Sequence, residues 1–496
     1  MLDDISRIGP VLAFAVTAAL ILVWDFLPQD RAVPESRGKA LLGFALLGPA
    51  VSAIWTGVLL ANNVRDSMFA GSAVLDDFSY FFFFLFAGIA AAILLASHES
   101  AKRFGDYEGE FYALILFASA AMLLLAASRD LILIFIALET TSISQYIMSA
   151  LQKDERSTEA GIKYLLMGAI SSAVILYGMA LLFGLTGTTR LVAPEGQASI
   201  ASAIADRGSD AALLLAVVML TAGLGFKMAV VPFQMWVPDV YEGSPAPVAA
   251  FLSVASKGAA FAVVLRIFFD GLPDSSISGT WSDVFAIVAA ISMCAGNLFA
   301  LVQTNIRRLL GYSSIAQAGN FMVGLAAITS DGGHALGASG VLFFVASYAL
   351  TNLGAFIAII AISNKIGSDE IEDYAGLAKR SPWLAGGLAL GLISLTGIPP
   401  TAGFVAKLYI FNAAVQSDLI WLVVIAVLNS VVSAFYYLKV ARIMFLDEPA
   451  GEVTYLQAPA ALKLALTIAV AGILFVGVIP SPLLHAARDA ASVFGQ

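Results

Sequence analysis

The chain has 496 residues, of which 60% are hydrophobic and only 12% charged, and its mean hydropathy is +0.89. Soluble proteins carry about 25% charged residues, so this composition excludes a soluble fold and predicts a polytopic membrane protein. The net charge of −9 is accompanied by no basic cluster longer than a pair, which argues against nucleic acid as a partner.

The residues that usually hold cofactors are scarce. Cys294 is the only cysteine, which excludes a thiolate-held iron–sulfur cluster and an internal disulfide. His98, His334 and His485 lie near span ends or in loops, and no pair is spaced for haem or a metal. No nucleotide-binding glycine pattern follows a strand. We therefore expect no cofactor in this chain, and the energy that drives it must come from elsewhere.

The acidic start, MLDDISRIGP, lacks the basic residues of a signal peptide, so the first apolar run is expected to remain as a span. Apolar stretches of about 17–25 residues then recur and predict an all-α membrane protein with about fourteen transmembrane helices. The predicted spans are 9–27, 39–61, 78–97, 110–127, 129–151, 161–186, 211–232, 246–269, 280–303, 306–329, 337–363, 383–414, 418–445 and 459–484.

Basic residues are distributed unevenly over the loops. Loops after odd-numbered spans hold sixteen of them, and the opposite side holds seven, namely Arg7, Arg65, Arg129, Arg190, Arg207, Arg266 and Arg488. The positive-inside rule then places both termini on the non-cytoplasmic side, which requires an even number of spans. We expect the membrane to be a bacterial cytoplasmic (inner) membrane.

Two spans are interrupted by proline. Lys227 precedes Pro232, and Pro399 and Pro400 precede Lys407. Proline removes a backbone donor and clashes with the preceding turn, so each helix should break there and expose carbonyl groups to a cavity. The interrupted spans are the seventh and the twelfth, which predicts two inverted five-helix repeats. We predict an N-terminal three-helix segment at 1–109, repeats at 110–269 and 280–445, and a C-terminal helix within 446–496.

Four ionisable residues lie deep inside apolar runs: Glu139, Lys227, Lys257 and Lys407. A charge at the centre of a bilayer costs roughly 2.5–3.5 kcal/mol on insertion scales, so such residues usually serve a function. Glu139 and Lys227 are predicted to pair, each stabilising the charged form of the other. A buried lysine loses its proton readily, which makes the set a candidate proton relay. The alternative is an internal salt bridge that only fixes helix packing.

Other polar residues have two interpretations. Lys163, at the start of the sixth span, belongs to the relay or extends toward the cytoplasmic headgroups. Tyr312, Ser313, Ser314 and Gln317 hold water between the lysines or make hydrogen bonds that only pack helices.

Several stretches resemble the antiporter-like subunits of respiratory complex I. They are FKMAVVPFQMWVPDVYEGSPAPVAAFLSVASK (226–257), GIKYLLMGAISSAVILYGMALLFG (161–184), RRLLGYSSIAQAG (307–319) and SLTGIPPTAGFVAKLYIF (394–411). The DVYEGSPAPV portion is most similar to the N-type subunit of NADH–quinone oxidoreductase. The resemblance covers about residues 130–446.

The resemblance implies specific roles. Glu139 matches the family's fifth-helix glutamate, Lys227 and Lys407 match the lysines of the two broken helices, and Lys257 matches the central eighth-helix lysine. Many relatives have histidine where this chain has Gln234 and Gln317. Glutamine orients water but does not exchange protons near neutral pH. The lysines are therefore the groups expected to gain and lose protons, with bound water between them.

The resemblance therefore implies a proton-translocating membrane-arm subunit of NADH–quinone oxidoreductase. FMN, the iron–sulfur clusters and the quinone site are expected in partner subunits, and the neighbours to be M-, L- and K-like subunits that lead to the peripheral arm. Two alternatives stay open: a subunit of a multisubunit cation/proton antiporter, and a scaffold that transports nothing.

Overall fold

The computed structural model describes residues 2–26, 34–193, 197–205, 210–273, 275–327, 335–448, 456 and 458–494. The N-terminal part contains α1 (Leu2–Arg7), α2 (Gly9–Phe26), α3 (Pro34–Ala45), α4 (Leu47–Ala61), β1 (Asp66–Met68), η1 (Phe69–Gly71), β2 (Ala73–Leu75), α5 (Asp77–Ala101) and η2 (Lys102–Tyr107). The short strands form an antiparallel hairpin in which Asp66 faces Leu75. This hairpin is a small departure from the predicted all-α fold.

The middle of the chain contains α6 (Glu108–Ala127), α7 (Leu131–Ser149), α8 (Glu155–Thr186), α9 (Ile200–Ile204), α10 (Ala211–Met228), α11 (Trp236–Gly243), α12 (Ala246–Phe251), η3 (Leu252–Ser256), α13 (Lys257–Leu265) and η4 (Arg266–Asp270). Here η3 and η4 are π-helical turns that make α12 to η4 one continuous helix.

The C-terminal part contains α14 (Ser275–Ala300), α15 (Ile306–Ala326), α16 (Ala335–Ile366), η5 (Ile371–Tyr374), α17 (Leu377–Arg380), α18 (Pro382–Thr396), α19 (Ala402–Gln416), α20 (Ile420–Leu446), α21 (Ala460–Val478), α22 (Ser481–Ala491) and η6 (Ser492–Phe494). Each predicted span coincides with helical structure. The count of fourteen spans and the division into repeats at 110–269 and 280–445 stay predictions.

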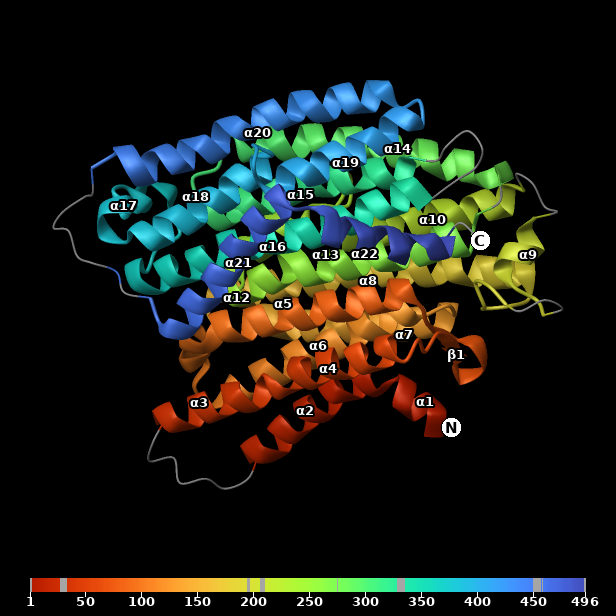
Figure 1. The fold of residues 1–496 in the computed structure, drawn as a ribbon, viewed down its shortest axis with the longest axis horizontal. Helices are drawn as coiled ribbons and strands as arrows, with labels where there is room; N and C mark the ends of the chain where they lie inside the picture. Colours follow the sequence, from red (N-terminus) through yellow and green to blue (C-terminus); the bar gives the residue numbers. More distant parts are fainter. Residues whose placement is uncertain are drawn as a thin grey trace.

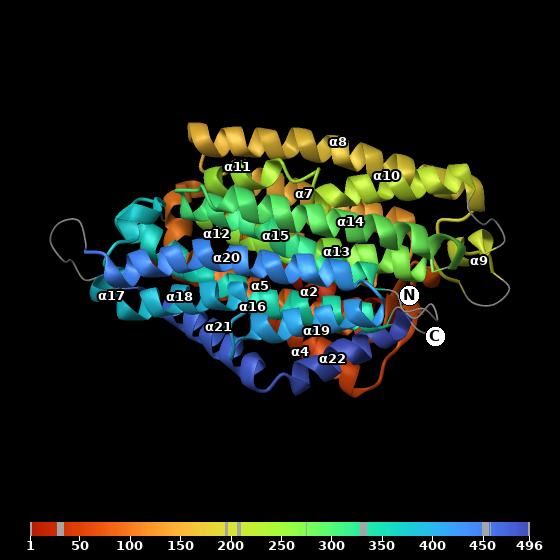
Figure 2. The same ribbon diagram turned by 90° about the horizontal axis from the view of Figure 1, so that it is seen from above.

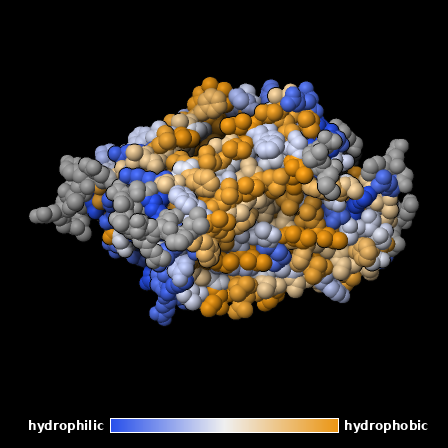
Figure 3. All heavy atoms as spheres, turned by 90° about the horizontal axis from the view of Figure 1, so that it is seen from below, coloured by the Kyte–Doolittle hydropathy of each residue, from blue (hydrophilic) through white to orange (hydrophobic). Residues whose placement is uncertain are grey.

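The long helices run side by side, as an assembly of membrane-spanning segments requires (Figures 1 and 2). Within the described residues, eleven helical stretches are long and apolar enough to cross a membrane. Hydrophobic side chains form a broad central belt on the face shown in Figure 3, and hydrophilic side chains gather toward its ends. Both chain ends lie at the same end of the molecule (Figure 1), which we call the termini end.

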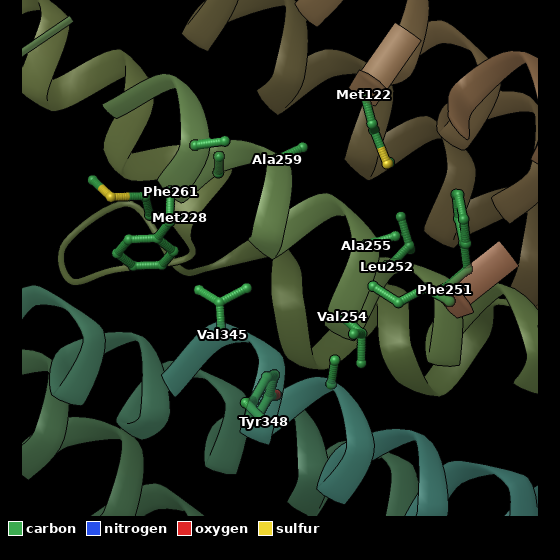
Figure 4. Packing of buried hydrophobic residues seen from close by; sticks show 14 of the residues in the cluster. Met122, Met228, Phe251, Leu252, Val254, Ala255, Ala259, Phe261, Val345 and Tyr348 are labelled. Carbon is green, nitrogen blue, oxygen red and sulfur yellow. The ribbon is translucent and has the colours of Figure 1, made fainter. Parts of the chain in front are cut away.

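The helix that carries Lys257 forms the centre of the molecule. Every residue from Pro247 to Asp270 is buried. Figure 4 shows Phe261 of this helix near Val345 of α16, while Met122 of α6 lies on another side. A charged group placed on this helix is therefore shielded from lipid by protein on all sides.

Both predicted breaks are confirmed. Helix α10 ends at Met228, where Ala229 takes a left-handed conformation with φ 63°, and α11 begins at Trp236. Helix α18 ends at Thr396, followed by Gly397 with φ 90°. A Cβ atom on Gly397 would lie 2.9 Å from Cδ of Lys407, so this glycine serves both the turn and the close approach of the lysine.

Candidate functional site

Lys227 lies in the last turn of α10, just before the break, and is buried. Its Nζ atom donates to Ser142 Oγ at 2.5 Å and to Tyr146 OH at 3.3 Å. Ser142 and Tyr146 are four residues apart on α7, so they form one face of that helix. The ammonium group is thus held by neutral hydroxyl oxygens.

Glu139 lies on the same helix as these hydroxyls but is only partly buried. Its Oε1 atom accepts a hydrogen bond from Ser172 of α8. Glu139 and Lys227, both among the described residues, form no ion pair within 4 Å in this conformation, although their charges attract across the longer gap, so the predicted pairing stays a prediction. The gap follows from position along α7, because the ammonium of Lys227 lies at Ser142, about one turn beyond Glu139.

Aromatic and polar side chains fill the space between the first two lysines. The rings of Tyr146 and Tyr164 meet edge to face with centroids 4.7 Å apart. Tyr164 OH donates to Gln145 Oε1 at 2.9 Å, and Ser256 Oγ reaches the same oxygen at 3.3 Å. The polar contacts that begin at Lys227 therefore reach Ser256, the residue that precedes Lys257 in the sequence.

Lys257 directly follows the π-helical turn η3 and is buried. Its Nζ atom donates to the backbone carbonyl of Ser314 and, at 2.6 Å, to Ser314 Oγ. The hydroxyls of Tyr241 and Tyr348 lie 3.3 and 3.4 Å from that Oγ. Ser314 thus joins the lysine to two tyrosines from α11 and α16.

Helix α15 continues this polar line toward the second broken helix. Ser313 Oγ is hydrogen-bonded to Tyr437 OH of α20. One turn beyond Ser314, Gln317 Nε2 donates to the carbonyl oxygen of Leu395 at 3.0 Å. Gln317 Oε1 accepts from Asn320 at 3.1 Å, which fixes the amide orientation.

Lys407, in α19, is the last lysine of the series and is also buried. Its Nζ atom donates to the carbonyl oxygen of Thr396 at 2.9 Å and to Ser430 Oγ of α20 at 3.2 Å. Thr396 is the last residue of α18, so the break supplies the acceptor. The proline positions predicted that carbonyl groups freed at the break would face a polar partner, and here that partner is the ammonium of Lys407.

The three buried lysines share one property. Among the described residues none of them forms an ion pair, and all are hydrogen-bonded to neutral oxygen atoms. A buried ammonium without a counter-ion is costly, and it can give up its proton without leaving a carboxylate unpaired. The arrangement suits groups that change protonation state.

Lys163 lies outside this line, in a half-exposed charge cluster. It pairs with Asp239 at 2.8 Å and with Glu159 at 2.7 Å, and Arg308 also contacts Asp239. Burial alone would raise the pKa of Asp239, but hydrogen bonds from Lys163 and Arg308 outweigh it and hold the pKa below its usual value. A place for Lys163 in the relay stays a prediction.

The predicted water-organising residues divide into two groups. Ser313, Ser314 and Gln317 belong to the polar line described above. Gln234 and Tyr312 do not contact a buried lysine within the described part of the chain. Gln234 Oε1 is buried without a partner, and the Tyr312 ring lies beside Phe299, 5.6 Å between centroids.

Several residues that contact Glu139 or the buried lysines, or lie between the lysines, were not predicted from the sequence. The side-chain hydroxyl and amide groups involved are those of Ser142, Gln145, Tyr146, Tyr164, Ser172, Tyr241, Ser256, Tyr348, Ser430 and Tyr437, and the backbone carbonyl is that of Thr396. A signal exists for α7, where Glu139, Ser142 and Tyr146 recur at helical spacing within an apolar run. Within the described residues, no group of three or more His, Cys, Asp or Glu side chains is arranged to hold a metal ion.

Comparison with known proteins agrees with this geometry. The family model described as NADH:quinone oxidoreductase/Mrp antiporter, TM, matches residues 128–433. A chain of respiratory complex I from Thermus thermophilus, solved with bound aureothin, superposes with a TM-score of 0.78 at 31% identity over 96% of this chain and 98% of that one. A chain of the Mrp complex from Dietzia sp. has a TM-score of 0.85 at 20% identity, covering 100% of this chain and 98% of that one, which shows a shared fold.

The fold and the family match thus define an antiporter-like, proton-translocating membrane subunit of respiratory complex I. Curated relatives are named NADH-quinone oxidoreductase subunit N. The one from Dehalococcoides mccartyi is 40% identical over 96% of this chain and 97% of its own length. The one from Moorella thermoacetica is 41% identical, with 97% of each chain covered. This chain belongs to the NADH-quinone oxidoreductase subunit N family.

Proposed function

We propose that the chain moves protons through a relay of Glu139, Lys227, Lys257 and Lys407, coupled to quinone reduction in partner subunits. The observation that carries this proposal is the set of polar side chains that lies between three buried lysines, each bonded to neutral oxygens. A structural salt bridge would pair each ammonium with a carboxylate instead.

The first step of the proposed relay is a change in the distance between Glu139 and Lys227. In the present conformation Glu139 is bonded to Ser172 and Lys227 to Ser142. Movement of Glu139 toward Lys227 would favour the charged lysine, and withdrawal would favour release of its proton. The partial exposure of Glu139 makes it the member of the set that a neighbouring subunit reaches most directly.

The released proton then passes along Tyr164, Gln145 and Ser256 to Lys257, and from there along α15 to Lys407. Gln145 and Gln317 have no titratable group in the neutral range, so they orient hydroxyls and bound water, and the lysines hold the proton. Lys407 releases it on the far side of the membrane.

The wider assignments follow from family membership. M-, L- and K-like subunits are the proposed neighbours, and the proposed FMN, iron–sulfur clusters and quinone site lie in partner subunits. Both termini are proposed to face the non-cytoplasmic side of a bacterial inner membrane. The shared position of the chain ends supports an even number of spans (Figure 1).

The test is Lys227→Ala in the assembled complex, reconstituted in liposomes, with NADH–quinone activity and proton uptake measured together. We expect proton transport to fall by about a hundredfold or more, in the range seen when an acid–base group is removed. The matched control is Lys379→Ala, an exposed lysine paired with Glu448. Normal pumping and normal quinone reduction by Lys227→Ala would refute the relay.

A further inference from the structure

Arg266 lies nine residues after Lys257 on the same central helix and is 0% exposed. The sequence predicts a loop position for it, whereas the structure buries it near the termini end. Each nitrogen of the guanidinium has a partner. Nη2 donates to Asp76 Oδ1 at 2.8 Å, Nη1 to Asp270 Oδ2 at 3.1 Å, and Nε to the carbonyl oxygen of Ala126 at 3.1 Å.

A second arginine makes the cluster electrically neutral. Arg129 contacts Asp270 at 3.1 Å and Asp76 at 3.5 Å, so two arginines face two aspartates. Burial alone would raise the pKa of Asp76, but Arg266 and Arg129 outweigh it and keep the pKa below its usual value. Asp76 therefore stays ionised, and Arg266 keeps its counter-ions.

The cluster joins segments that are distant in sequence. Asp76 caps α5 by accepting from the backbone N–H of Ser79, and Arg129 connects α6 to α7. The guanidinium of Arg266 lies 4.4 Å from the ring centroid of Phe78, which in turn packs against Phe494 at 5.1 Å. The end of the central helix is thereby fixed to α5 and to the C-terminal turn.

The helix between Lys257 and Arg266 offers no polar side chain. Residues 258–265 read GAAFAVVL and are all buried, over roughly 13 Å of helix. Beyond Lys407, by contrast, α19 carries Tyr409, whose hydroxyl accepts from the exposed Arg488, and then Asn412 and Gln416, whose amides are exposed. A proton at Lys257 thus faces apolar helix and a buried cation, while a proton at Lys407 faces polar groups that lead to the surface.

We propose that Arg266 is a barrier residue that prevents protons from leaving Lys257 directly toward the termini end, so that they must pass to Lys407. The guanidinium keeps its own proton and its two carboxylate partners are already paired, so the cluster offers an arriving proton no acceptor. Residues 258–265 offer none between the cluster and Lys257. This inference rests on the proposed relay, and it adds that protons leave the relay only through Lys407.

The experiment measures proton leakage without turnover. The assembled complex is reconstituted in liposomes, a pH gradient is imposed in the absence of NADH, and its decay is followed with an enclosed pH dye. Arg266→Gln removes the cation and is expected to speed the decay by about tenfold, which corresponds to loss of a ~1.4 kcal/mol barrier. Asp270→Asn breaks the same cluster but leaves Arg266 in place, so it is expected to hold the gradient like the unmodified complex.

The two variants separate a barrier from a structural clamp. A clamp predicts equal leakage from both, and that result would overturn the proposal, as would a tight Arg266→Gln complex. Arg266→Gln leaves buried carboxylates unpaired, which can prevent assembly of the complex. In that case the charge-balanced double variant Arg266→Gln/Asp270→Asn takes its place. The proposal requires that this double variant leak protons. Because no turnover is involved, failure here is distinguishable from failure of the relay, which Lys227→Ala tests.

Discussion

The side chains of Gln317 and Lys407 donate hydrogen bonds to consecutive carbonyl groups, those of Leu395 and Thr396, at 3.0 and 2.9 Å. Both carbonyls belong to the last turn of α18, where the break leaves them without helical partners. Gln317 thereby holds the acceptor of Lys407 in place, and it lies one turn from Ser314, the partner of Lys257. Gln317 thus lies between the contacts of Lys257 and those of Lys407.

Replacement of Gln317 should reveal this connection. Gln317→Leu removes the donor to Leu395 and should lower proton transport by about fivefold, the equivalent of one hydrogen bond of ~1 kcal/mol. Gln317→His restores a donor and adds a titrating group, so transport should recover and acquire a pH dependence near about 6.5. A flat pH profile identical to that of the unmodified complex would show that position 317 does not face the path.

Tyr146→Phe removes one hydroxyl contact of Lys227 and keeps the ring that packs against Tyr164. The loss of one hydrogen bond, about 0.5–1.5 kcal/mol, should leave assembly intact. Proton transport should fall severalfold while the amount of purified complex stays constant. The control is Tyr177→Phe, an exposed tyrosine on α8. Equal effects of the two substitutions would remove Tyr146 from the path.

Ser314→Ala removes the hydroxyl that Lys257 shares with Tyr241 and Tyr348, but the backbone carbonyl of residue 314 remains as an acceptor. We therefore expect partial loss of transport, smaller than for substitution of the lysine itself. The measurement compares proton uptake by the Ser314→Ala complex with uptake by a Lys257 variant, which should be the lower of the two. A loss as complete as that of the lysine variant would contradict this account of the site.

The charge cluster around Asp239 gives a pH-dependent stability. Because Lys163 and Arg308 lower the pKa of Asp239 in the folded state, its stabilisation is present above the unfolded value, about 3.9, and is lost as pH falls through the lower folded pKa. Asp239→Asn should lower the melting temperature of the purified complex at pH 7. The difference from the unmodified complex should shrink as pH falls below about 4. A difference that is constant with pH would mean that the charge of Asp239 does not contribute.

Sequence patterns predicted the features that depend on local chemistry. Hydropathy located the spans, and Pro232 and Pro399 located the breaks that end α10 and α18. The contacts of the lysines depend on which helices meet. For that reason the sequence did not predict that Lys227 would contact Ser142 or that Lys407 would contact Thr396. The missing Glu139–Lys227 ion pair has the same cause, since a shift of one turn along α7 decides which acceptor lies opposite the ammonium.

Two further features left no sequence signal. The π-helical turn before Lys257 depends on how α12 and α13 pack in the core, and nothing in LSVAS distinguishes it from an ordinary helix. Arg266 resembled a loop residue because it lies near the end of an apolar run. Asp270 lies four residues later in the same turn, but Asp76 and Arg129 come from elsewhere in the chain and reach the cluster only in the fold.

The most direct test of the central claim is the number of protons moved per NADH oxidised by a complex that carries Lys257→Met. Methionine approximates the volume of lysine and lacks its charge, so the buried central helix should keep its packing. If Lys257 carries protons between Lys227 and Lys407, this ratio must fall while the complex remains assembled. An unchanged ratio, at an unchanged rate of quinone reduction, would contradict the account.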